Sequence, residues 1–83
     1  MKLGIQYDTG DGIQTVVAGP AAFIGWELAN GTKASRLASD GVGIADLSEL
    51  AWRQLQLEGD VPPLEVWRKK LQDIQPYSTE DPT

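Results

Sequence analysis

The chain has 83 residues, a mass of 9.0 kDa and a formal net charge of −5. This length suffices for one small domain and is too short for two cores of ordinary size. Twelve acidic residues against seven basic ones give the wrong sign for binding a phosphate backbone, so we expect no nucleic-acid partner. Because Cys and His are absent, disulfides, thiol chemistry, the usual general base and the commonest metal ligand are excluded.

The sequence does not predict a membrane span. The longest segment without a charge, 12–26, is shorter than the roughly 20 residues that cross a bilayer, and Gly19 and Pro20 interrupt it. The first residues lack the layout of a secretory signal, because Gly4 and Asp8 precede any sustained apolar run. Together with the absence of Cys, this predicts a cytoplasmic protein with no membrane partner.

Residues 2–18 predict a β-hairpin. Apolar side chains alternate with other residues on both sides of a cluster of turn-forming residues at 8–12, which suits a loop of about five residues. If Tyr7 lies opposite Ile13, all the odd-numbered apolar side chains fall on one face of the hairpin. We therefore predict that Ile13 and Val17 face the core. A lone hairpin is marginally stable, so the rest of the chain must cover this face.

Apolar periodicity predicts three main helices, at about 20–30, 44–58 and 63–74, with a short turn near 32–37 between the first two. Pro20 suits a first helical turn, and Gly31 suits the position after the last. The acidic segment 75–83 is predicted to be a flexible tail. The expected fold is α+β and mainly helical: one domain over 1–74, with the hairpin packed on a bundle of three to four helices and a disordered acidic C-terminal tail.

No motif predicts catalysis, a cofactor or a metal. Asp8 and Asp11 lie in a glycine-containing loop, but the calcium motif needs glycine at its sixth position, where Ile13 stands. The segment 10–15 lacks the third glycine of a dinucleotide fingerprint and precedes a strand. Glu58 and Asp60 suit a solvated helix end in a chain that leaves little room for a cleft. We therefore predict that the protein is not an enzyme.

The tryptophans give the clearest functional hint. Trp26 and Trp67 lie on the apolar stripes of their helices and are predicted to be core residues. Trp52 lies at the edge of a stripe, and both Leu57 and Val66 fall outside one. We therefore predict a partner-binding patch made of Trp52, Leu57 and Val66 together with one strand edge of the hairpin. The basic run 68–70 is interpreted as a solvated face or as a partner for nearby acids.

The order of these features resembles a known family. In this chain the matching positions are Trp26-Glu27, Lys33, Leu37, the string Ile-Ala-Asp-Leu-Ser-Glu-Leu-Ala-Trp at 44–52, Leu55, Gly59, Leu64-Glu65-Val66-Trp67, Leu71, Asp73 and Ile74. This ordered set, covering about 1–74, looks like the tail assembly chaperones of long-tailed bacteriophages, especially those that infect actinobacteria. The chain departs from that family at Leu64, where Phe is usual, and at Pro62-Pro63, which replace a Ser or Thr cap.

The resemblance implies a binding protein that acts in the host cytoplasm. Members of the family bind the tape measure protein, keep it soluble, help bring tail tube subunits to it, and leave before the virion is complete. Self-association is a further possibility. Two alternatives stay open: a small acidic phage protein that inhibits a host factor by imitating the charge of DNA, and a connector or other minor component of the virion.

Overall fold

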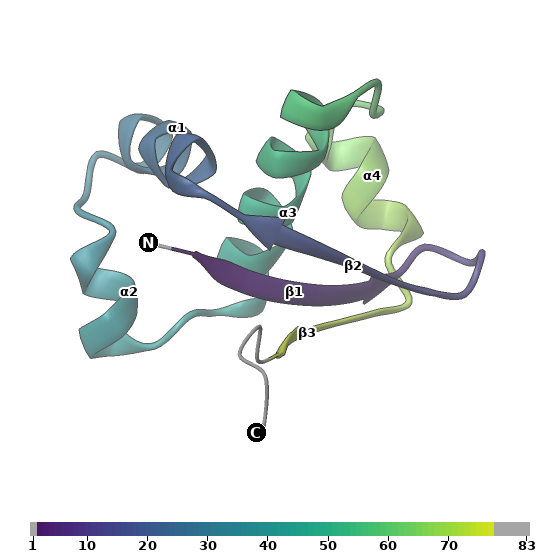
Figure 1. The fold of residues 1–83 in the computed structure, drawn as a ribbon, viewed down its shortest axis with the longest axis horizontal. Coiled ribbons are helices and arrows are strands. Elements are labelled where there is room, and N and C mark those ends of the chain that lie inside the picture. The colour runs from purple at the N-terminus through teal and green to yellow at the C-terminus, as the bar shows by residue number, and fades with distance from the viewer. Residues whose placement is uncertain (1, 78–83) are drawn as a thin grey trace.

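The computed structural model describes residues 2–77, shown in Figure 1. Within this range the chain forms an α+β fold that is mainly helical, as the sequence predicts. The elements in chain order are β1 (Leu3–Asp8), β2 (Ile13–Ala18), α1 (Pro20–Asn30), α2 (Ser35–Asp40), α3 (Ile44–Glu58), α4 (Leu64–Lys70) and β3 (Asp73–Tyr77).

The three strands form one antiparallel sheet in the order β2-β1-β3. Helix α3 packs against both outer strands, and α1 and α4 pack against α3 (Figure 1). The core therefore lies between the sheet and α3, where Ile5 of β1 and Leu50 of α3 are fully buried. Trp26 and Trp67 are buried from α1 and α4, which confirms that both are core residues.

The register of the hairpin differs from the prediction by one residue. Asp8, and not Tyr7, lies opposite Ile13, because the loop 9–12 has four residues instead of about five. Two glycines close this short loop with positive φ angles, 106° at Gly10 and 102° at Gly12, which favour glycine over other residues. Side chains alternate along a strand, so this shift moves every side chain of β2 to the opposite face.

The shift exchanges the core and surface residues of β2. Val16 and Ala18 are buried beneath the sheet, whereas Ile13 is 69% exposed and Val17 is 37% exposed. The prediction that Ile13 and Val17 face the core is therefore wrong. Both alternating sets of β2 are largely apolar, so hydrophobic pattern alone does not choose between the two registers.

The C-terminal part of the fold also differs from the prediction. The last helix ends at Lys70 instead of Ile74, and residues 73–77 form β3 instead of belonging to a helix and a tail. The backbone N–H of Gln72 donates to the carbonyl oxygen of Asp8 at 2.7 Å, which draws the chain onto the edge of β1. The predicted domain boundary after Ile74 thus falls inside a strand, and residues 78–83 of the predicted tail lie outside the described residues.

The first and third helices occur where the sequence predicts them. Pro20 is the first residue of α1, and Gly31 ends it in the left-handed conformation, with its N–H donating to the carbonyl of Glu27 at 2.8 Å. The predicted turn at 32–37 is displaced toward the C-terminus, since α2 spans Ser35–Asp40. These local signals succeed because each helix end is set by residues next to it in sequence.

The register predicts unequal losses of stability for two neighbouring substitutions. Val16→Asp places a carboxylate in the core and should lower the free energy of unfolding by more than about 3 kcal/mol. Val17→Asp lies on the open face and should cost less than about 1 kcal/mol. Urea denaturation followed by tryptophan fluorescence measures both. A larger loss for Val17→Asp would restore the register in which odd-numbered residues face the core.

Candidate partner-binding surface

The residues that carry the family resemblance hold the fold together. Trp26 of α1 donates its indole N–H to Oδ1 of Asp46 at 3.3 Å, and Oδ2 of the same carboxylate accepts the N–H of Gly43 at 3.3 Å. Asp46 therefore caps α3 and joins it to α1. The carboxylate of Glu27 accepts the backbone N–H of Ala34, which fixes the connection between α1 and α2.

The other two tryptophans also connect elements. Trp52 of α3 donates its indole N–H to the carbonyl oxygen of Pro62 at 2.7 Å and so anchors the link to α4. Trp67 of α4 packs edge-on against the ring of Tyr7, with the ring centroids 5.5 Å apart and the planes at 61°. The motif of ordered tryptophans thus specifies how four elements pack, and its residues are not free to form a binding face.

The structure does not bring Trp52, Leu57 and Val66 into one patch. Trp52 is half-buried on the side of α3 that faces α4, and Leu57 lies five residues further, about 140° around the helix. Nε of Arg68 on α4 donates a hydrogen bond to Oγ of Ser48 on α3 at 2.7 Å, so Arg68 lies on the side of α4 that faces α3. Val66 precedes Arg68 by two residues and therefore points away from α3. Leu57 is 60% exposed and Val66 is 45% exposed, on two different helices.

Leu57 is 60% exposed, as the prediction that it falls outside the apolar stripe of α3 requires, whereas Leu55 packs against the core. Leu57 follows the fully buried Leu50 by seven residues, which is two helical turns, so both side chains point in nearly the same direction. In Figure 1 the C-terminal turns of α3 extend past β2. Leu57 is therefore exposed because the elements that cover Leu50 do not reach the end of the helix.

The strand β2 adds a second apolar surface, which the sequence analysis misses. Ile13 and Val17 lie on the face of the sheet away from α3, with Thr15 between them. The error in the register hides them, because it assigns both side chains to the core. The pair of glycines at 10 and 12 is the one sequence signal for the shorter loop that exposes them.

The two edges of the sheet are not equally protected against pairing with a further strand. Strand β3 carries Pro76, which has no N–H to offer to another strand, and begins with Asp73. Strand β2 contains neither a proline nor a charged side chain, and among the described residues no strand lies beyond it. The edge of β2 is therefore open to the addition of a further strand.

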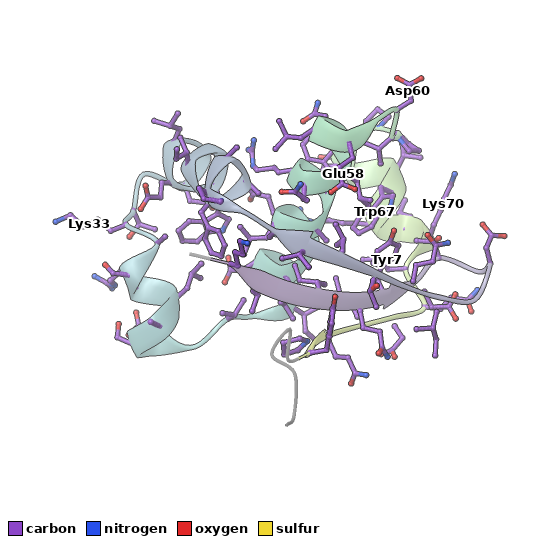
Figure 2. All side chains as sticks on the ribbon, in the orientation of Figure 1. Tyr7, Lys33, Glu58, Asp60, Trp67 and Lys70 are labelled. Atoms are coloured by element: carbon purple, nitrogen blue, oxygen red, sulfur yellow. The ribbon has the colours of Figure 1, made fainter. Side chains whose placement is uncertain are left out.

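An acidic groove adjoins the loop end of β2. This cavity, of about 530 Å³, lies between the hairpin loop and the ends of α3 and α4 and is lined by Tyr7, Asp11, Gln14, Glu58, Asp60, Trp67 and Lys70, among others. Figure 2 shows Glu58 and Asp60 coming from the end of α3 and the residues after it, with Lys70 projecting from α4. Three carboxylates against one ammonium group favour a cationic occupant.

The groove fits binding better than acid–base chemistry. Glu58 and Asp60 are exposed to water, and Glu58 accepts a hydrogen bond from Nε2 of Gln54 at 2.8 Å. Carboxyl groups that act as acid and base work in sites from which water is excluded. Among the described residues, no three Asp or Glu side chains are grouped closely enough to hold a metal ion.

Comparisons with known proteins add no relative. No family model, no curated protein and no solved structure matches this chain. Within residues 2–77, no helix has the length and apolar character needed to cross a bilayer. The function proposed below is therefore inferred from the ordered tryptophan motifs, the exposed apolar side chains of β2 and α3, and the acidic groove.

Tyr7 links the groove to the stability of the domain. Burial raises the pKa of its phenol above the usual value, and the nearby carboxylate of Glu58 raises that pKa further. The hydroxyl of Tyr7 donates to Oε1 of Gln14 on β2 at 3.2 Å. Burial and the negative charge of Glu58 therefore both favour the neutral phenol in the folded state.

The raised pKa of Tyr7 predicts a loss of stability in alkali. The unfolded chain releases this proton near pH 10 and the folded chain at higher pH, so the contribution is complete below about pH 10 and disappears as pH rises through the folded pKa. Urea denaturation between pH 9 and pH 11 should show a decline that Tyr7→Phe reduces. Tyr77→Phe, on β3, is the matched control and should retain the full decline; equal declines in all three proteins would contradict this role.

Proposed function

We propose that this chain is a tail assembly chaperone of a long-tailed bacteriophage. In this role it binds the tape measure protein in the host cytoplasm, keeps it soluble, and helps recruit tail tube subunits. The observation that carries the proposal is the ordered set of tryptophan motifs, because each of the three tryptophans has a specific partner in the fold. Trp26 with Asp46 and Trp52 with Pro62 are contacts that ordinary amphipathic helices do not require.

The surface supports a role in binding without catalysis. Ile13, Val17 and Leu57 expose apolar area on a domain of net charge −5. Apolar contacts provide affinity for a client with apolar stripes, while the acidic background favours solubility. Small separate patches of this kind suit weak binding followed by release.

Imitation of DNA is the less favoured alternative. Such a mimic needs its acids in a row on one face, whereas here two acids are paired with bases: Arg36 with Asp40 at 3.1 Å and Arg53 with Glu49 at 2.8 Å. A role as a virion component is distinguished by the content of mature particles. The chaperone is expected to be absent from them.

Co-expression tests the proposed function. The chain and the tape measure protein encoded by the same genome should together yield more soluble tape measure protein than the tape measure protein expressed alone. Pull-down through a tag on the chain should recover the complex. No gain in solubility and no recovered complex would contradict the chaperone role.

A charge at Leu57 should separate binding from folding. Leu57→Glu places a carboxylate on a surface that is 60% exposed, so we expect less than about 1 kcal/mol loss in the free energy of unfolding and a loss of client solubilisation. Leu28→Glu on α1 makes the same change at another exposed leucine and should leave the client soluble. Loss of client solubilisation with Leu28→Glu but not with Leu57→Glu would place the binding surface on α1.

A further inference from the structure

We propose that the free edge of β2 binds an extended, apolar segment of a partner protein as a fourth strand, and that basic residues of this segment lie in the groove formed by Asp11, Glu58 and Asp60. The edge is uncharged along its whole length, from Ile13 to Ala18, and only Gln14 and Thr15 are polar. Addition of a strand at such an edge gains main-chain hydrogen bonds, and alternate side chains determine specificity.

Helix α3 provides a floor for the added strand. Neighbouring strands lie about 4.8 Å apart, so a fourth strand would lie just beyond β2, over the C-terminal turns of α3 that extend past it in Figure 1. Leu57 lies on these turns, in line with the buried Leu50. Every second side chain of the added strand would then face α3, where Leu57 lies. The other side chains would lie beside Ile13 and Val17 on the open face of the sheet.

The charges beside the edge define the chemistry of the partner. Gln14 of β2 lines the same groove as Asp11, Glu58 and Asp60, so this groove lies at the loop end of the strand. An antiparallel strand beside β2 would bring its C-terminal end to this position. We therefore assign basic side chains to the C-terminal end of the bound segment and apolar ones to its middle.

A second copy of this chain is disfavoured as the occupant. Pairing of β2 with its symmetry mate is antiparallel and would place the uncharged Val17–Ala18 end of the mate beside the groove, where it offers no basic side chain to Glu58 and Asp60. Each copy also carries a net charge of −5. Like charges that meet at an interface lower affinity, whereas a basic segment gains from the same field.

This inference deepens the proposed function and relies on it only for the identity of the partner. A chaperone that holds a client segment in extended form would keep that segment from pairing with others. The edge itself can be tested with a synthetic peptide and no phage component. If the peptide does not bind but co-expression keeps the client soluble, strand addition at the edge is wrong and the chaperone role stands. If the peptide binds but the client stays insoluble, the chaperone role is wrong and the edge site stands.

The probe is a peptide of alternating Thr and Val that ends in two lysines, acetylated and amidated at its termini. Titration into the ¹⁵N-labelled chain should shift the amide signals of β2 and of the last turn of α3, and fluorescence anisotropy of the labelled peptide gives Kd. Moving the lysines to the N-terminal end, or replacing them with glutamates, should raise Kd by about fivefold or more, and added salt should reduce the difference.

Changes to the peptide backbone identify the mode of binding. N-methylation of the alternate amides that face β2 should weaken binding by about tenfold or more, while methylation of the other set should leave it unchanged. An equal effect of both sets would overturn strand addition. If the chain alone forms a dimer that Val17→Lys dissociates, a second copy occupies the edge and the proposed occupant is wrong.

Substitutions in the chain test the groove. Glu58→Gln and Asp60→Asn should each raise the Kd of the lysine peptide by about two- to fivefold. The Kd of the glutamate peptide should not rise in either variant. Asp40→Asn removes the same charge from α2 and serves as the control. Equal effects of Asp40→Asn and Asp60→Asn would show that only net charge matters and would overturn the assigned site.

Discussion

The packing of α3 across one face of the sheet is the contact on which the other elements depend. The two fully buried large side chains, Ile5 of β1 and Leu50 of α3, both belong to the core in this layer. Trp26 and Trp67 add aromatic area from the two flanking helices. In a domain this small, a single helix–sheet layer must provide most of the apolar burial, so each flanking helix is fixed by its contacts with α3.

Features set by local residues could be predicted, and features set by distant pairing could not. Pro20 and Gly31 mark the ends of α1 whatever the rest of the chain does. The register of β2 depends on the length of one loop, and both alternating sets of β2 are largely apolar, so the pattern leaves two solutions. Strand β3 forms because β1 offers a second edge, which is a long-range contact with no signal in residues 73–77 themselves.

The candidate surface shows the same division. Leu57 is exposed as the sequence predicts, and the structure adds the reason: the elements that cover Leu50 two turns earlier do not reach the end of α3. Trp52 is predicted to lie in the binding patch because it is an aromatic residue at the edge of a stripe, but its hydrogen bond to Pro62 joins α3 to the link before α4. Ile13 and Val17 became visible only with the correct register. Residue type therefore indicated which side chains mattered, and only the three-dimensional arrangement showed which of them serve the fold.

The central position of β1 has a consequence for folding during synthesis. This strand leaves the ribosome before the other described elements, yet its second neighbour, β3, is the last of them to be made. Until Tyr77 emerges, β1 has an unpaired edge, and the hairpin must wait for the described helices α1 to α4 before the sheet is complete. During this interval, other strand-forming segments compete with β3 for the same hydrogen-bonding groups. The sheet is therefore complete only after β3 has docked on β1, and a delay in that step leaves the edge of β1 open to pairing with other strands.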